Sequence, residues 1–277
     1  MFSLESYKAA LERGGVVRRL DRGVLAVTGA DRATWLQGLL TNDVESLTDG
    51  QSTYAAYLTP QGRMITDMNV VARGDRLLLD VPAPLAAALR DKLDGLIFSE
   101  DVQVADESAH LWVWTVISEG ALVDVIDETL PAEYGHLPAI DIDTFEVIRI
   151  ERGVPRFLAD MNEDTIPLEA GIEDRAISFT KGCYVGQEII VRVTHRGGGR
   201  VAKKLVRWIA DSSAQVVPLP ESKIMAADRE IGRVTSAAFS PGMNRVVGLG
   251  YVHRDFTGSG TDVTVVWKDA PIKAVVQ

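Results

Sequence analysis

One segment of the chain, residues 181–188, brings together residue types that could do chemistry. It reads Lys-Gly-Cys-Tyr-Val-Gly-Gln-Glu and contains Cys183, the only cysteine among the 277 residues. Two glycines bracket the cysteine, which lets the backbone turn tightly and leaves the thiol reachable. Lys181 lies two residues before it and could favour the thiolate, the nucleophilic form. The other interpretation is a buried cysteine that acts as a small hydrophobic residue, as unpaired cysteines commonly do.

The single cysteine limits the metal chemistry of the chain. It cannot form a disulfide within one chain, and it cannot supply the cysteine-rich ligand set of a zinc or iron–sulfur site by itself. We therefore expect no metal site made by this chain alone. The sequence also has no phosphate-loop, dinucleotide-binding, zinc-peptidase or Gly-x-Ser-x-Gly pattern. Nucleotide hydrolysis, nicotinamide chemistry and zinc peptidase activity thus lose their usual sequence signals.

Charge and hydropathy narrow the choice of partners. The chain has 29 Lys and Arg residues against 39 Asp and Glu, so its net charge is −10, and 46% of its residues are hydrophobic. An acidic chain is a poor general binder of nucleic acid, because phosphates need a basic surface. The N-terminus shows no signal-peptide pattern, and no segment is long and apolar enough for a membrane span. We expect a cytoplasmic globular protein that binds neither nucleic acid nor a membrane.

Basic residues are nevertheless concentrated in residues 181–207, where Glu188 is the only acidic residue. A local basic patch on an acidic chain predicts a small anionic ligand. Within this span, His195 has no ligand partner at metal-site spacing and is expected to be structural, and the Gly197-Gly198-Gly199 run predicts a flexible hinge. The members of the patch are Lys181, Arg192, Arg196, Arg200, Lys203, Lys204 and Arg207.

The elements that must position these residues are mixed in the first half of the chain. Asp31 can cap a helix, and the turn Thr59-Pro60-Gln61-Gly62 suits a tight hairpin. The connections between strands are too short for crossovers, so we expect antiparallel pairing in an α+β fold. The pattern predicts helices over 7–13, 31–40 and 84–93, and strands over 24–27, 54–58, 64–71, 76–81, 111–117 and 121–126.

The second half changes in character. An amphipathic helix is expected over 143–153, and residues 154–180 follow without clear periodicity, as in functional loops of compact proteins. Strands expected over 201–209, 231–239, 246–252 and 263–266 alternate with turn residues. We therefore predict an α+β domain over residues 1–199 and a small all-β domain over residues 200–277.

Several motifs together resemble one family. Residues 181–188 are similar to the signature of the YgfZ family, folate-binding proteins that assist iron–sulfur enzymes and are related to the glycine-cleavage T-protein, an aminomethyltransferase. Further similar segments follow in order along almost the whole chain. They are Leu36-Gln37-Gly38, Thr41-Asn42-Asp43-Val44, Gln61 to Asp67, Arg149 to Pro155, Pro167 to Gly171, Gly232 to Ser236 and Phe239-Ser240-Pro241.

The resemblance implies a fold, a cofactor and partners. The fold would be two similar antiparallel α+β subdomains that form a folate-binding core, followed by a small C-terminal β-barrel. The cofactor would be tetrahydrofolate or a one-carbon derivative, and the partners would be iron–sulfur enzymes or assembly proteins. Asp67 and Glu169 align with carboxylates that contact folate in T-proteins. The family also has a helix after the cysteine motif, so we expect a helix over Ile189–Val193 despite its β-branched content.

Folate chemistry suggests further contacts. The pterin has donors and acceptors, the middle is aromatic and the glutamate tail is anionic, so a site needs carboxylates, apolar walls and cations. Tyr54, Met64 and Tyr184 could supply the walls. The basic patch could hold the tail, with Gln187 and Arg192 among the residues that contact the cofactor.

Each of these residues also has a purely structural interpretation. Asp67 could be an ordinary exposed strand residue, because carboxylates are mostly exposed, and Glu169 could cap a neighbouring turn. Lys181 and Arg192 could be solvated charges, and Tyr184 could be a core aromatic.

One departure from the T-protein pattern bears on function. T-proteins typically have Gly-Arg-Glu where this chain has Gly186-Gln187-Glu188, and glutamine cannot neutralise an anion. The leading hypothesis is therefore a tetrahydrofolate-binding protein that assists maturation or repair of iron–sulfur enzymes, with Cys183 as the functional thiol and Lys181 assisting it. A folate-dependent aminomethyltransferase or methyltransferase, and a non-catalytic adaptor whose barrel docks other proteins, are the alternatives.

Overall fold

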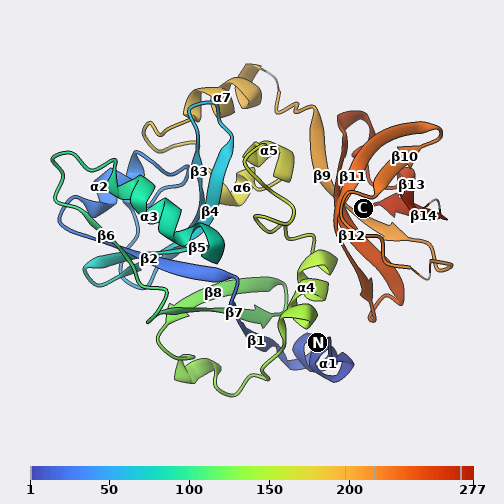
Figure 1. Ribbon diagram of the computed structural model, residues 1–277, viewed down its shortest axis with the longest axis horizontal. Helices are drawn as coiled ribbons and strands as arrows, with labels where there is room; N and C mark the ends of the chain where they lie inside the picture. The colour runs from blue at the N-terminus through green and yellow to red at the C-terminus, as the bar shows by residue number, and fades with distance from the viewer. Residues whose placement is uncertain (1, 197, 215, 269) are drawn as a thin grey trace. The chain divides into compact units, whose positions relative to one another are not determined.

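The computed structural model describes residues 2–196, 198–214, 216–268 and 270–277 (Figure 1). The chain forms two compact units, each made of two separate stretches. Unit 1 consists of Met1–Ile142 and Ile172–Ile189, and unit 2 of Asp143–Gly171 and Ile190–Gln277. Gly197 of the predicted hinge and the side chains of His195 and Arg196 lie outside what the structure describes. The domain boundary near residue 199 stays a prediction.

Unit 1 is built on a five-stranded sheet in which all neighbouring strands are antiparallel. The short connections predicted this pairing, and only Gly74 and Asp75 separate β4 from β5. The strand order is β3-β4-β5-β2-β6, with the bounds β2 (Arg22–Thr28), β3 (Ser52–Leu58), β4 (Met64–Arg73), β5 (Arg76–Pro82) and β6 (Gln103–Asp106).

The two faces of this sheet bury different side chains, as the two-residue period of a strand requires. On β2, Leu25 and Val27 belong to one core cluster, which also contains side chains of α2 (Arg32–Gln37) and α3 (Ala86–Asp94). Val24 and Ala26 belong to a second cluster with β7 and β8 residues. Because both faces of the sheet are covered, the buried residues of β2, Val24 to Val27, form a continuous apolar run in the sequence.

A three-stranded antiparallel sheet completes the strands of unit 1 (Figure 1). Its order is β1-β7-β8, with β1 (Gly15–Arg18), β7 (Trp112–Ser118) and β8 (Ala121–Asp127). The sequence did not predict β1 or β6, which are both only four residues long. Besides α2 and α3, the helical elements of unit 1 are α1 (Leu4–Arg13), η1 (Ala83–Leu85), η2 (Ala132–Tyr134) and α6 (Glu173–Ala176). The first three residues of α7 (Gln187–Val191) also belong to unit 1.

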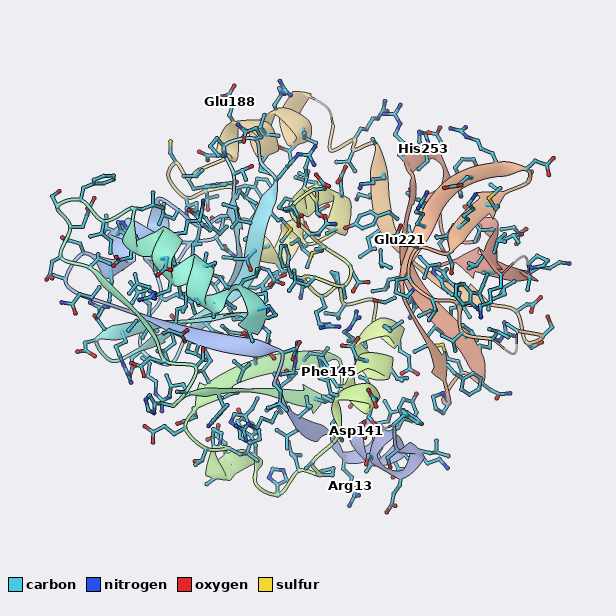
Figure 2. All side chains as sticks on the ribbon, viewed as in Figure 1. Arg13, Asp141, Phe145, Glu188, Glu221 and His253 are labelled. Atoms are coloured by element: carbon cyan, nitrogen blue, oxygen red, sulfur yellow. The ribbon has the colours of Figure 1, made fainter. Side chains whose placement is uncertain are left out.

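Three expectations need correction. Asp31 precedes α2 but does not cap it with its side chain, because its carboxylate accepts a hydrogen bond from the Asp101 amide at 2.8 Å instead. The helix expected over 143–153 is present as α4 (Ile142–Glu151), but it is not amphipathic, since seven of its ten residues are buried, among them Phe145 (Figure 2). The 154–180 stretch is not wholly irregular and contains α5 (Pro167–Ala170) and α6.

The end of unit 2 is a closed six-stranded barrel. The predicted α+β fold with a C-terminal β-barrel is therefore confirmed, although β10 and β14 were not predicted. Residues 187–196 are helical, as expected, and end in a π-helical turn over Arg192–Arg196. The strand order of the barrel is β10-β11-β12-β9-β14-β13, with β9 (Lys203–Ala210), β10 (Lys223–Ala226), β11 (Arg229–Ser240), β12 (Arg245–His253), β13 (Asp262–Trp267) and β14 (Ala270–Val276). The short 3-10 helix η4 (Arg254–Phe256) follows β12.

No helix in the part of the chain that the structure describes is long and apolar enough to span a bilayer.

The barrel core makes a stability prediction. Trp208 is fully buried, and a Cβ added at Gly248 on the neighbouring strand would lie 2.2 Å from its Cζ2 atom. We expect Gly248→Ala to lower the free energy of unfolding by about 3 kcal/mol, the upper end of the usual cost of overpacking. Gly258→Ala is the control, because its Cβ would meet nothing closer than 3.6 Å. Urea unfolding that shows equal losses in both variants would contradict this account of the core.

Candidate functional site

Asp67 and Tyr54 come together on the hairpin of β3 and β4. Asp67 is directly opposite Ala56 in the ladder, so Tyr54 is its diagonal neighbour on the same face. The Tyr54 hydroxyl donates to Asp67 Oδ2 at 2.8 Å. Only 4% of Asp67 is exposed, which excludes an ordinary exposed strand residue.

Arg22 on β2 holds the other oxygen of this carboxylate. Its Nη1 donates to Asp67 Oδ1 at 3.1 Å, and its Nε and Nη2 donate to Asp80 on β5. Burial lowers the pKa of Arg22, but the charges of Asp80 and Asp67 outweigh burial and place the pKa above its ordinary value. The guanidinium therefore stays charged, and three strands fix the position of Asp67.

Arg175 covers the outer side of Tyr54. Its guanidinium carbon lies 4.4 Å from the centre of the tyrosine ring, a cation–π geometry. The Asn42 side-chain amide donates at 2.9 Å to the backbone oxygens of both residues. Burial raises the pKa of Tyr54 well above its ordinary value, Asp67 raises it further, and Arg175 acts in the opposite direction. Tyr54 is therefore a hydrogen-bond donor to Asp67 as well as an aromatic wall.

The resulting group can bind a ligand through hydrogen bonds. An ionised carboxylate oxygen has more than one acceptor position, so Asp67 can accept from a ligand N–H in addition to Tyr54 and Arg22. A buried carboxylate of fixed orientation suits an amine or amide edge of a heterocycle. Met64, by contrast, is fully buried in unit 1, and its role as a ligand wall stays a prediction.

Lys181 is anchored rather than solvated. Its Nζ donates to the backbone oxygens of Gln37, Leu40 and Asn42 at 2.6, 2.7 and 2.9 Å. Gln37 is the last residue of α2, where helix carbonyls lack intrahelical partners, and Leu40 and Asn42 follow that helix. An ammonium has three N–H donors, so any help that Lys181 gives to the Cys183 thiolate would come through its charge and not through a hydrogen bond.

The environment also alters the titration of this amine. Burial lowers the pKa of Lys181 to about 8, while Asp43 and Glu45 act in the opposite direction. The ammonium also lies 5.3 Å from the ring centre of Tyr184. Burial raises the pKa of Tyr184 to about 12, and this side chain is buried, as the core interpretation supposed.

Cys183 is exposed between two anchored residues, which excludes the buried-hydrophobe interpretation. After it, Gly186 adopts φ +85°, and a Cβ there would lie 2.6 Å from the Thr59 backbone oxygen. Only glycine fits this close approach to the β3–β4 turn. Lys181 and Gly186 thus fix both sides of a short loop whose exposed member carries the thiol.

The remaining predicted residues lie elsewhere. Gln187 begins α7, and its backbone amide donates to the Tyr184 oxygen at 3.2 Å. Arg192 is exposed and belongs to unit 2, as does Glu169. Glu169 is buried in α5, and its Oε2 accepts from the Ile166 amide at 3.4 Å, so the capping role is present.

The barrel, and the chain as a whole, are similar to known proteins. Residues 203–277 match the glycine cleavage T-protein C-terminal barrel domain. This match covers the C-terminal barrel alone. An aminomethyltransferase of Caldanaerobacter subterraneus subsp. tengcongensis is 23% identical over 99% of this chain and 86% of the relative. An iron-sulfur cluster assembly factor IBA57 homolog of Neosartorya fischeri is 27% identical over 82% of this chain and 63% of the relative.

A solved structure supports the same fold. The aminomethyltransferase T of the Bartonella henselae glycine cleavage system superposes with a TM-score of 0.83, covering 99% of this chain and 88% of that chain, at 16% identity. At this identity the likeness concerns the fold. The chain thus has α+β subdomains and a C-terminal barrel with folds like those of that protein.

Sequence reasoning missed the partners of the candidate residues. Arg22, Asp80 and Arg175 hold or cover Asp67 and Tyr54, yet none was singled out. A signal existed for Asp80, because it interrupts an apolar strand, and a charge in such a run needs a buried partner. Arg175 had no such signal, since it is an exposed side chain in the four-residue helix α6, which the sequence did not predict.

The Tyr54 contact gives a prediction about stability. We expect Tyr54→Phe to lower the free energy of unfolding by about 1.5–3 kcal/mol, because it removes a hydrogen bond to a buried carboxylate. Tyr57→Phe on the same strand is the matched control, because the Tyr57 hydroxyl has no hydrogen-bond partner among the described residues. Urea unfolding of both variants measures the difference, and equal stability of the two variants would contradict the Tyr54–Asp67 bond.

Lys181 gives a prediction about pH. Its folded pKa of about 8 lies below the ordinary value of 10.5, so between these values the unfolded chain binds more protons than the folded chain. Stability must therefore rise with pH in this window. We expect the wild type to gain stability relative to Lys181→Met from pH 8 to pH 10, by urea unfolding. A constant or falling difference would show that this amine is not buried.

Proposed function

We propose that this protein binds tetrahydrofolate and assists the maturation or repair of iron–sulfur enzymes in the cytoplasm. The observation that carries the proposal is the exposed Cys183, held between two anchored residues in a segment that resembles the YgfZ signature. A relative named as an iron–sulfur cluster assembly factor, similar over 82% of this chain, supports the same function. A surface thiol fixed in this way is suited to act on another molecule.

The residues of unit 1 fit one part of the cofactor. The pterin ring presents N–H donors, and Asp67 is a buried acceptor whose orientation is fixed by Arg22 and Tyr54. Tetrahydrofolate, when bound, supplies an amine that carries a one-carbon unit. Glu169 of unit 2 is the second proposed carboxylate, and Gln187 and Arg192 stay proposed contacts of the same cofactor.

Cys183 would act with a partner. One thiol cannot hold an iron–sulfur cluster, which takes several ligands, so the other ligands must come from an iron–sulfur enzyme, an assembly protein or a second copy of this chain. The exposed position of the thiol allows such a contact. The role of Lys181 is then to keep the loop in place through its three carbonyl contacts.

Replacing Cys183 by alanine should abolish function without lowering the stability of the fold. In cells lacking the endogenous protein, we expect Cys183→Ala to leave the activity of a dependent iron–sulfur enzyme near the level of the deletion, while urea unfolding stays within about 0.5 kcal/mol of wild type, as for exposed positions. Asp174→Asn, at an exposed position of α6 in the same unit, should restore activity fully. Full activity of the Cys183→Ala cells would overturn the functional role of the thiol.

A second candidate is an aminomethyltransferase. The relative of that name, similar over 99% of this chain, favours it, and Gln187 in place of the arginine of T-proteins argues against it. Aminomethyl transfer to tetrahydrofolate with an aminomethyl-loaded carrier protein is the direct assay. Turnover that is lost in Asp67→Asn would favour this candidate over the assembly role, and no turnover by wild type would remove it.

A further inference from the structure

Two residues, Thr41 and Asn42, cover the outer edge of strand β3. β3 is an edge strand of the five-stranded sheet, and backbone groups on the free side of an edge strand need partners when they are buried. The Thr41 amide donates to the Ala56 oxygen at 3.0 Å, and its hydroxyl accepts from the Ala56 amide at 2.8 Å. The Asn42 side-chain amide donates to the Tyr54 oxygen at 2.9 Å. These two residues thus take the place of a further strand beside Tyr54.

The same two residues hold α6, which comes more than 130 positions later in the chain. Thr41 Oγ1 donates to the Ala176 oxygen at 2.6 Å, and the Asn42 amide donates to the Arg175 oxygen at 2.9 Å. A helix of four residues has too few internal hydrogen bonds to fix its own position. The place of Arg175 beside Tyr54 therefore depends on these contacts from outside the helix.

The Asn42 side chain uses every polar atom that it has. Its Nδ2 carries two hydrogens, which go to the Tyr54 and Arg175 oxygens, and its Oδ1 accepts from the Asp43 amide at 2.9 Å. Only an amide in this orientation makes all three contacts, because an oxygen without a hydrogen cannot donate to a backbone oxygen. One side chain thus sets the distance between the segments of Tyr54 and Arg175.

This distance determines how the two side chains meet. The Arg175 guanidinium carbon lies 4.4 Å from the centre of the Tyr54 ring, and the Tyr54 hydroxyl donates to Asp67 Oδ2. A shift of Tyr54 would change which positions on the Asp67 carboxylate are free to accept from a ligand. Groups of a binding site must be held to within about 0.5 Å of their productive positions. Asn42 need not touch the ligand itself, because it acts through Tyr54.

The backbone of Asn42 has a different contact. Its carbonyl accepts from Lys181 Nζ, as do the carbonyls of Gln37 and Leu40. These three contacts use no side-chain atom of Asn42. A substitution that changes only the side chain of Asn42 therefore leaves the anchor of the Cys183 loop in place.

We propose that Asn42 is a positioning residue for ligand binding at Asp67. Its side-chain amide holds Tyr54 and Arg175 in place for the ligand, and its carbonyl serves the Cys183 loop independently. This role rests on the proposed binding of tetrahydrofolate at Asp67. All of these residues belong to unit 1.

Asn42→Asp tests this role, because aspartate has nearly the same shape but cannot donate to the two backbone oxygens when ionised. In calorimetric titrations with tetrahydrofolate, we expect Asn42→Asp to bind about tenfold more weakly than wild type, since Tyr54 and Arg175 lose their shared anchor. Alkylation by iodoacetamide reports on the thiol alone, because Cys183 is the only cysteine. Its rate should stay within about twofold of wild type, since the surroundings of the thiol set its reactivity.

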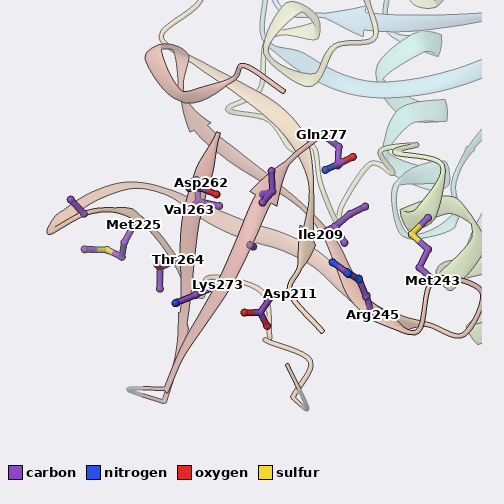
Figure 3. Close-up of a pocket in the computed structure, with 13 residues that line it drawn as sticks. Ile209, Asp211, Met225, Met243, Arg245, Asp262, Val263, Thr264, Lys273 and Gln277 are labelled. Carbon is purple, nitrogen blue, oxygen red and sulfur yellow. The ribbon is translucent and has the colours of Figure 1, made fainter. Parts of the chain in front are cut away.

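Asn244→Asp is the matched control. It makes the same change of shape and charge in unit 2, at an exposed position of the turn between β11 and β12. Its neighbours Met243 and Arg245 line a hollow of about 860 Å³ on the barrel, and both are labelled in Figure 3. Asn244 has a φ of +51°, which aspartate tolerates as asparagine does. We expect wild-type affinity and a wild-type alkylation rate for this variant.

Three outcomes would contradict the role of Asn42. Wild-type binding that Asn42→Asp leaves unchanged would overturn this role and leave the proposed function standing. A loss of affinity together with an alkylation rate changed by more than about twofold would also overturn it, because the substitution would then loosen unit 1 as a whole. Absence of binding by wild type would overturn the proposed folate function and this role with it.

Discussion

The positive charge of Arg22 is the constraint on which the candidate site in unit 1 depends. Two buried carboxylates on different strands, Asp67 and Asp80, share its guanidinium. A buried carboxylate without a partner is costly by several kcal/mol, so β2, β4 and β5 must keep their register if either is to be tolerated. Burial raises the pKa of Asp80 to about 6 even so, and Asp124 adds to this, while Arg22 acts against it. Asp67 also accepts a hydrogen bond from the Tyr54 hydroxyl. Folding and the proposed ligand recognition thus both depend on the Arg22 side chain.

The irregular segments of both units are fixed by the same means, a cation surrounded by oxygen atoms. In unit 2, Arg149 donates to Asp160 at 2.7 Å, to Ser236 at 2.9 Å and to the Val154 oxygen at 3.1 Å, which ties α4 and the following loop to β11. In unit 1, Lys181 does the same for the loop of Cys183. Such anchors let a stretch without regular hydrogen bonding keep a defined shape, and they leave the thiol exposed without leaving it loose.

The sequence predicted regular elements well and buried polar contacts poorly. Strands such as β4 follow from their apolar and β-branched content, and the β3–β4 turn follows from Pro60 and Gly62. The short strands β1 and β6 lack enough residues to show a period. Tyr54 was expected as an aromatic wall, but its bond to Asp67 depends on strand register, which a single sequence does not specify. The flanking glycines favoured a reachable Cys183 but left a buried cysteine open as the alternative. The carbonyl contacts of Lys181 join residues about 140 positions apart and have no local signal.

In the proposed function, Asp67 belongs to a tetrahydrofolate site and the Cys183 thiol acts separately from it. Calorimetric titration of wild type, Asp67→Asn and Cys183→Ala with tetrahydrofolate tests this most directly. We predict saturable binding by wild type, affinity about tenfold weaker or lower for Asp67→Asn because a charge-assisted hydrogen bond is lost, and unchanged affinity for Cys183→Ala. No binding by wild type, or an affinity that Asp67→Asn leaves unchanged, would contradict the account.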